Sequence, residues 1–458
     1  MKQTVNARKI VLDLLIEVDK EEGFATKLLQ GALAKVDYLP RNEKAFIKRL
    51  FEGCVERRIY LEHIIKRYLK TPISKVKKTV RLILRMGVFQ LLYMDSVPDS
   101  AACDEAVKLC RQMHFDAQSG FVNGVLRNIA RDKERLSCEQ YTDLAEYRNG
   151  KGLAEAASIF YSMPLFLVQK YEKRFGKERT LQILEGYYKE SGITLRMCSG
   201  KPADDAWISE VEKLGITVTS HPYLPYAYIL KGAAGAGQLP GFDRGLFYIQ
   251  DVSSMLVCEL AGITEGMKVI DVCSSPGGKG LHAYDLGAKV SARDVSIEKV
   301  DRLCENAGRL GVSGDRYETL VQDARLFRIE DEGSADVVIA DVPCSGYGII
   351  GKKCDIKYGI SPEKEESLTH LQREILDSAA RYVKLGGILM YSTCTINYAE
   401  NEEQMKYLME LGFEPQSVEE KLPDALRGLT GKDGYIQLLP GVHECDGFFI
   451  AKLRRKVE

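Results

Sequence analysis

The chain has 458 residues, of which 45% are hydrophobic and 28% are charged, and this composition is typical of a globular protein with two or three domains. No apolar run reaches the length of a membrane span and no signal peptide opens the sequence, so we expect a cytoplasmic protein. Twelve scattered cysteines without a Cys-x-x-Cys pair, and six histidines outside any Cys/His cluster, argue against a structural metal and favour a reducing compartment.

The formal net charge of −1 conceals an asymmetry along the chain. Residues 1–138 carry 26 lysines and arginines against 17 acidic residues, whereas the remaining residues carry 38 against 48. A basic N-terminal part suggests a polyanionic partner such as nucleic acid. A solvated helical surface would have the same composition, so the charge alone leaves both interpretations open.

The N-terminal part, residues 6–130, repeats its apolar residues at helical spacing. The segment 80–93 is richly apolar and is predicted to be the central helix of a core. Pro72 and Pro98 interrupt the pattern, and segments 101–109 and 120–129 complete an all-α bundle. No motif in this part indicates catalysis.

A polar stretch over residues 131–158 is predicted to be a boundary and a linker. The following part, up to about residue 235, mixes helical and strand patterns. We predict helices over 165–175 and 180–188 and short strands over 193–197 and 227–230. This mixture favours a small α+β module.

From about residue 247 onward, strands and helices alternate. The predicted strands are 268–273, 289–293, about 319–322, one ending at Asp341, one ending at Cys394, and 447–453, with a helix over 297–310. This alternation predicts a mostly parallel sheet with helices on both faces, a Rossmann-like α/β domain.

Three strand ends suggest a nucleoside cofactor. Gly277 and Gly278 let the backbone approach a ligand closely at the first strand end. Asp294 lies about twenty residues further on, where an acid binds ribose hydroxyls in nucleotide folds, and Asp323 could bond an adenine amino group. The chain lacks both Gly-x-Gly-x-x-Gly and Gly-x-x-x-x-Gly-Lys-Ser/Thr. A cofactor without phosphates is therefore favoured, and S-adenosyl-L-methionine is predicted.

Two cysteines follow predicted strands near an aspartate. Cys344 lies in Asp341-Val342-Pro343-Cys344-Ser345-Gly346, and Cys394 lies in Ser392-Thr393-Cys394-Thr395. Because ligands bind outside the carboxyl ends of the strands in open α/β sheets, two thiols at this edge favour nucleophilic chemistry over packing.

These motifs together resemble the RNA cytosine-5 methyltransferases. The likeness covers residues 160–458 and includes Cys273-Ser274-Ser275-Pro276-Gly277-Gly278-Lys279, Gln250-Asp251-Val252-Ser253-Ser254 and Asp446-Gly447-Phe448-Phe449. Residues 84–93 and 121–127 resemble a NusB-type RNA-binding helical domain. The whole chain therefore resembles the RsmB-type 16S rRNA methyltransferases, which implies a helical domain (1–138), a linker (139–158), a small RNA-binding module (159–240) and a catalytic domain (241–458).

The resemblance implies a reaction and its residues. It implies methylation of C5 of a cytosine in 16S rRNA, with a loop cytosine as target and a monomeric enzyme. Cys394 corresponds to the nucleophile and Cys344 to the thiol that assists release, while Asp341 and Lys279 complete the catalytic set. The implied cofactor contacts are Cys273, Ser274, Ser275, Pro276, Gly277, Gly278, Lys279, Asp294, Asp323 and Asp341.

Two alternatives are weaker. A tRNA cytosine-5 methyltransferase would share the catalytic motifs, but its common members lack the NusB-like domain. A non-catalytic RNA-binding assembly factor would not need both Cys344 and Cys394.

The chain departs from the family pattern at four places. Gly280 stands where threonine is common, Ser274-Ser275 replace two alanines, Arg293 replaces an apolar residue, and Cys354 interrupts a basic-Pro-Asp-Ile-Lys string. None of these changes removes a group that the chemistry needs, although cofactor affinity could differ.

Overall fold

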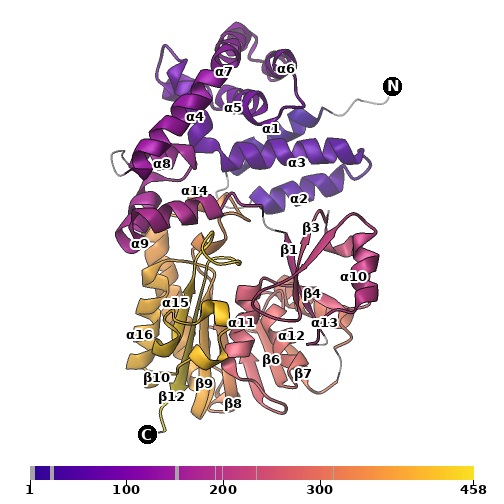
Figure 1. The fold of residues 1–458 in the computed structure, drawn as a ribbon, viewed down its shortest axis with the longest axis vertical. Helices are drawn as coiled ribbons and strands as arrows, with labels where there is room; N and C mark the ends of the chain where they lie inside the picture. Colours follow the sequence, from indigo (N-terminus) through magenta and orange to yellow (C-terminus); the bar gives the residue numbers. More distant parts are fainter. Residues whose placement is uncertain are drawn as a thin grey trace. The chain divides into compact units, whose positions relative to one another are not determined.

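The computed structural model describes residues 6–20, 25–149, 154–190, 192–198, 200–233, 235–312 and 314–457. Contacts between Cα atoms divide the chain into two compact units (Figure 1). The helical unit comprises Met1–Glu185 and Ile350–Gly359, and the catalytic unit comprises Gly186–Ile349 and Ile360–Glu458. Within the described ranges, no helix combines the length and the hydropathy that crossing a membrane requires.

The helical unit is built around one buried helix. Its helices are α1 (Ala7–Val18), α2 (Ala25–Lys35), α3 (Arg41–Glu56), α4 (Arg58–Arg67), α5 (Lys78–Tyr93), α6 (Asp99–Gln112), α7 (Ser119–Arg148), α8 (Ala154–Phe160), α9 (Leu165–Gly186) and α14 (Ile356–Gly359). The predicted core helix is confirmed, because nearly every residue from Val80 to Leu91 of α5 is buried. Gly53 of α3 allows the ring of Phe89 to pack closely, since a Cβ at Gly53 would lie 1.9 Å from that ring.

A segment from the second half of the sequence completes the helical unit. Residues 350–359 follow the Cys344 loop directly, and α14 lies within them. The carboxylate of Asp355 accepts a hydrogen bond from the backbone amide of Ala25, which opens α2, at 2.9 Å. The hydroxyl of Tyr358 donates to the carbonyl oxygens of Glu56 (3.1 Å) and Ser162 (3.2 Å). Removing the first 155 residues would therefore expose this segment as well.

The catalytic unit begins with a small antiparallel sheet. Its strand order is β2 (Thr217–Ser220), β3 (Ala227–Lys231), β1 (Ile193–Met197) and β4 (Phe247–Ile249), and α10 (Asp205–Glu212) places Trp207 in its core. The same hydrophobic core continues through α11 (Val252–Ala261) to Val269 of the large sheet. The small sheet and the large sheet therefore share one core.

The large sheet is Rossmann-like, as predicted. Its order is β10 (Phe413–Pro415), β12 (Phe448–Arg455), β9 (Val383–Thr393), β8 (Ala335–Asp341), β5 (Lys268–Asp271), β6 (Lys289–Asp294) and β7 (Tyr317–Val321), with β11 (Tyr435–Leu438) paired to β12. The strands from β9 to β7 are parallel, whereas β10, β11 and β12 run antiparallel to their neighbours. Its helices are α12 (Gly278–Asp285), α13 (Ile297–Arg309), α15 (Pro362–Tyr382) and α16 (Glu402–Glu410).

The predicted linker over 139–158 differs from the observed elements. Residues 139–148 continue α7, where Leu144 is buried, and residues 150–153 lie outside the described residues. Helices α8 and α9 belong to the helical unit and not to the small module. The predicted break between the helices 165–175 and 180–188 falls at Gly176, whose φ of 75° interrupts α9.

Candidate active site

The candidate site lies where the strand order reverses between β5 and β8, at their carboxyl ends. A cavity of about 170 Å³ opens there. Its lining comprises Tyr248, Ile249, Gln250, Asp251, Ser254, Asp271, Cys273, Ser274, Ser275, Pro276, Gly278, Lys279 and Asp341. Most of the predicted cofactor motif therefore surrounds one cavity, together with several residues that were not predicted to form the site.

Side chains from other elements bind the glycine turn that follows β5. Gly277 has a φ of 113° and begins α12, a conformation that disfavours side chains. The carbonyl oxygen of Pro276 accepts hydrogen bonds from the Tyr248 hydroxyl and the Asn306 amide, both at 2.9 Å. A Cβ at Gly278 would lie 3.3 Å from both Gln250 and Tyr248. The turn thus brings backbone close to polar side chains of the cavity wall.

Asp271 carries an unsatisfied carboxylate oxygen. The side chain is buried, its Oδ2 accepts a hydrogen bond from Ser274 Oγ at 2.8 Å, and its Oδ1 has no hydrogen-bond partner in the described structure. Burial raises the pKa of Asp271 to about 7, although Ser274 and Lys279 act in the opposite direction. Such an atom fits a ligand that brings a hydrogen-bond donor, such as the ammonium group of an amino acid moiety.

Neither Asp294 nor Asp323 lines the cavity, although Asp294 reaches the glycine turn. Asp294 accepts hydrogen bonds from the backbone amide of Ser275 (2.9 Å) and from Lys299 Nζ (2.9 Å). Asp323 is bound by the guanidinium of Arg325, which lowers the pKa of the carboxyl. A ribose or an adenine at these positions would share the carboxylates with these cationic side chains.

An ion pair between the buried Lys279 and the partly exposed Asp341 joins the cofactor turn to the first cysteine motif. Lys279 Nζ lies 2.5 Å from Asp341 Oδ2, and Asp341 Oδ1 accepts a hydrogen bond from Ser392 Oγ at 2.8 Å. Burial lowers the pKa of Lys279, but the neighbouring carboxylates of Asp341 and Asp271 raise it on balance. The site therefore holds an ammonium group against the Asp341 side chain.

The two predicted thiols are adjacent. Cys344 Sγ and Cys394 Sγ are 3.3 Å apart. The two loops are joined by a Gly348 amide that donates to the carbonyl oxygen of Cys394 (3.0 Å). They are joined again by the hydroxyls of Ser345 and Thr395 (2.7 Å). The hydrogen bond with Cys394 and burial raise the pKa of the Cys344 thiol. Cys344 is therefore held as a protonated thiol beside Cys394.

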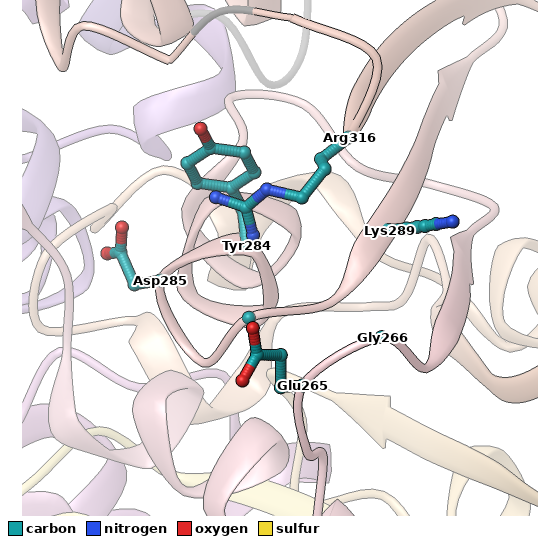
Figure 2. Close-up of a pocket in the computed structure, with 7 residues that line it drawn as sticks. Glu265, Gly266, Tyr284, Asp285, Lys289 and Arg316 are labelled. Atoms are coloured by element: carbon teal, nitrogen blue, oxygen red, sulfur yellow. The ribbon is translucent and has the colours of Figure 1, made fainter.

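A larger hollow of about 660 Å³ lies elsewhere on the catalytic unit (Figure 2). Glu265, Gly266, Tyr284, Asp285, Gly287, Lys289 and Arg316 line it. The Arg316 guanidinium lies 4.2 Å from the centre of the Tyr284 ring. This hollow is at the amino ends of β5, β6 and β7, whereas ligands of open α/β sheets bind at the carboxyl ends. The smaller cavity is lined by the glycine turn and by Asp341 of the Cys344 motif, so it is the candidate active site, although neither Cys344 nor Cys394 belongs to its lining.

Sequence reasoning missed two carboxylates of the site. Asp271 interrupts an apolar strand, and an acidic residue inside such a run was the available signal. Glu400 is fully buried and binds the backbone amide of Ser345 at 2.8 Å. Its position in a polar stretch after Cys394 gave no signal of burial.

Comparisons with known proteins relate the whole chain to one family. A family model described as "16S rRNA methyltransferase RsmB/F" matches residues 260–454, and a "NusB family" model matches residues 5–131. The chain is 31% identical over 464 residues to the "Probable ribosomal RNA small subunit methyltransferase B" of Bacillus subtilis, with full coverage of both chains. It is 30% identical over 467 residues to the "Ribosomal RNA small subunit methyltransferase B" of Cronobacter sakazakii, again with full coverage of both.

Solved structures share the fold. The structure described as "Crystal Structure of PH0851" has a TM-score of 0.77 at 24% identity and covers 99% of this chain and 100% of its own. "NSun6 from Pyrococcus horikoshii with SFG" has a TM-score of 0.56 at 22% identity and covers 64% of this chain and 98% of its own. The predicted fold class, with its Rossmann-like methyltransferase domain and NusB-like bundle, is confirmed.

Proposed function

Because this chain belongs to the RsmB/F family of 16S rRNA methyltransferases, we propose that it methylates C5 of a cytosine in 16S rRNA while Cys394 is bound covalently to C6. The observation that carries the proposal is the 3.3 Å separation of the Cys344 and Cys394 sulfur atoms, at the ends of the adjacent strands β8 and β9. Two thiols in this arrangement fit a reaction that forms and then breaks a bond to sulfur.

The chemistry explains why a thiolate is needed. C5 of cytosine is a weak nucleophile, and addition of the Cys394 thiolate to C6 moves electron density onto C5. After methyl transfer the C5 proton leaves to water, and its electron pair forms the double bond between C5 and C6 as the bond between C6 and Cys394 breaks. The electron pair of that broken bond returns to sulfur. We assign to the Cys344 thiol, which lies 3.3 Å from Cys394 Sγ, a hydrogen bond to that departing thiolate.

We assign the ion pair of Lys279 and Asp341 to contact with the target cytosine. Addition at C6 requires a hydrogen bond or a proton at N3 of cytosine, and we assign this contact to Asp341. The Lys279 ammonium, 2.5 Å from Asp341 Oδ2, carries the proton that this carboxyl can pass on. This assignment makes the pair, and not a permanently protonated Asp341, the source of the proton.

S-adenosyl-L-methionine is the cofactor of this methyltransferase, and it supplies a methyl group on an electrophilic sulfonium when bound. We assign its contacts to Asp294, Asp323, Asp341 and the turn from Cys273 to Lys279. Asp271 is added to this set because its Oδ1 is buried without a partner beside the cavity. Asp294 and Asp323 would then bind the ribose and the adenine.

The helical domain is assigned to RNA. The match to the NusB family over residues 5–131 and the basic surplus of residues 1–138 support this role. A base inside a helix is inaccessible to Cys394, so we propose a cytosine in an unpaired loop as the target. We also propose that the enzyme works as a monomer. We also propose RNA contacts for residues 186–240, the part of the predicted small module that belongs to the catalytic unit.

Variants of the two thiols test the covalent mechanism. Cys394→Ala should abolish methylation and form no covalent adduct with 16S rRNA. Cys344→Ala should still attack and transfer the methyl group, but should accumulate a protein–RNA adduct that survives a denaturing gel. Cys304→Ala, which removes an exposed thiol elsewhere in the catalytic unit, is the matched control and should behave as the natural protein does.

The outcomes separate the competing assignments. An adduct with Cys394→Ala in place of Cys344→Ala would reverse the two roles, and full activity of both variants would refute covalent catalysis. Mapping 5-methylcytidine in rRNA and tRNA from cells with and without the gene tests the substrate. Loss of 5-methylcytidine from tRNA alone in cells without the gene would favour the alternative of a tRNA cytosine-5 methyltransferase.

A further inference from the structure

Glu400 is a buried carboxylate with only uncharged partners. Its relative exposure is 0%, and it ends a short 3₁₀ helix (Tyr398–Glu400) six residues after Cys394. Oε2 accepts hydrogen bonds from the backbone amide of Ser345 (2.8 Å) and the Gln372 side chain (3.1 Å), and Oε1 accepts one from Asn397 (2.8 Å). A buried charge without an ion-pair partner is costly to keep, so its position calls for a functional reason.

The contacts of Glu400 converge on the peptide around Cys344. The Gln372 side-chain amide binds Glu400 and also donates to the carbonyl oxygen of Pro343 at 2.9 Å. The amide of Ser345 is bound by Glu400 itself. The residues on both sides of Cys344 are thus held by one hydrogen-bonded group, in which Glu400 belongs to the segment after Cys394 and Gln372 belongs to α15.

We propose that Glu400 is a positioning residue for the thiol pair, which fixes the Cys344 loop against the Cys394 loop so that Cys344 can assist release of the methylated base. The inference rests on the proposed roles of the two thiols and adds a third group to them. In this proposal Glu400 acts on Cys344 through the peptide bonds on its two sides, directly at the Ser345 amide and through Gln372 at the Pro343 carbonyl.

The charge of Glu400 has a second effect. Cys394 and Glu400 raise the pKa of the Cys344 thiol, the Gly346 backbone amide lowers it, and Tyr391 also lies within electrostatic range of the thiol. A carboxylate near a thiol disfavours the thiolate, so Glu400 helps to keep the proton on Cys344. Removing this charge without removing volume should therefore make Cys344 easier to ionise.

Glu400→Gln is the main test, and Glu403→Gln, an exposed glutamate one turn away on α16, is the matched control. Asn397 Oδ1 and Gln372 Oε1 have no hydrogen-bond partner among the residues that the structure describes, so both amides can reorient toward a glutamine at position 400. Glu400→Gln should fold, bind S-adenosylmethionine normally and keep the KM for RNA. Its kcat should fall about tenfold or more, the effect of losing a hydrogen bond to a charged group. A protein–RNA adduct should accumulate.

A double-mutant comparison separates positioning from general stability. In a Cys344→Ala background, Glu400→Gln should add nothing to the adduct level, because it acts through Cys344. An equal further loss in that background, or a fall in kcat with no adduct in the single variant, would overturn the proposal.

Alkylation of Cys344 by iodoacetamide, followed by mass spectrometry, tests the contact without RNA. In Glu400→Gln the pH profile of this alkylation should move to lower pH, whereas Glu403→Gln should leave it unchanged. An unchanged profile in Glu400→Gln would overturn the proposal. If the alkylation profile moves in Glu400→Gln but Cys344→Ala forms no adduct, the proposed role of Cys344 in release is refuted. The positioning contact of Glu400 is then still supported.

Discussion

Replacing Asp271 by asparagine should stabilise the protein at alkaline pH and much less at acid pH. The pKa of this buried carboxyl rises from 3.8 to about 7 on folding, mainly through burial. Because the folded state binds the proton more tightly, the contribution of this group to stability is fully present below pH 3.8 and is lost as the pH rises toward 7. Asparagine carries no charge and does not suffer this loss.

The expected magnitude follows from the two pKa values. A pKa raised from 3.8 to about 7 corresponds to about 4 kcal/mol of unfolding free energy at pH 8. Roughly 2–3 kcal/mol of that difference should appear between pH 5 and pH 8. The value is an upper bound, because the structure around Asp271 can relax and Lys279 loses a compensating charge in the variant.

Urea unfolding followed by tryptophan fluorescence measures the effect. Trp207 is the single tryptophan of the chain and belongs to the same hydrophobic core as Val269 of β5, so its signal reports on the catalytic unit. Asp301→Asn, on the exposed face of α13, is the matched control and should be neutral at both pH values. An Asp271→Asn variant that gains no more stability at pH 8 than at pH 5 would refute the assignment of a raised pKa.

Two further predictions concern ligands. Asp294→Ala should weaken S-adenosylmethionine binding about tenfold or more in calorimetry, because it removes charge-assisted hydrogen bonds, and unchanged affinity would exclude Asp294 from the site. Replacing Lys66, Lys70, Lys75 and Lys77, which are exposed on the helical unit, by glutamine should weaken binding of 16S rRNA fragments. Each lost phosphate contact should reduce the slope of log K against log salt by about 0.7–0.9, and an unchanged slope would place the RNA elsewhere.

The parallel part of the sheet was predictable because each strand is a short apolar run that ends in a polar residue. Those ends, at Asp271, Asp294, Asp341 and the two cysteines, converge at one edge by the geometry of parallel strands alone. The antiparallel strands β10 and β11 were not predicted. They have three and four residues, and their pairing to β12 depends on tertiary contacts that no local pattern encodes.

No local sequence pattern indicated that residues 350–359 belong to the helical unit. The segment reads as a polar loop, yet Lys357 is buried, and the partly buried Tyr358 binds residues more than 190 positions away in the sequence. Burial of Lys357 lowers its pKa to about 8, which a solvated loop would not do. Only the three-dimensional partners distinguish the two environments.

The departures from the family pattern become intelligible from their neighbours. A Cβ at Gly280 would lie 3.1 Å from Ser274 Oγ and 3.5 Å from Asp271 Oδ2, so the Ser274 hydroxyl occupies the space that a larger residue at position 280 would need. Serine at 274 and glycine at 280 therefore fit each other, and the hydroxyl still donates to Asp271.

Arg293 shows the same kind of compensation. Its guanidinium is buried, bonds to Asp331 (2.7 Å) and Gln322 (3.0 Å), and lies 5.2 Å from the centre of the Tyr382 ring. Successive side chains of a strand point to opposite faces, so Arg293 satisfies its charge on the face away from Asp294. The arginine at position 293 therefore forms an ion pair with Asp331 on one face of the sheet and leaves Asp294, the carboxylate assigned to the ribose, in place. This departure from the family pattern is thus compatible with the cofactor site.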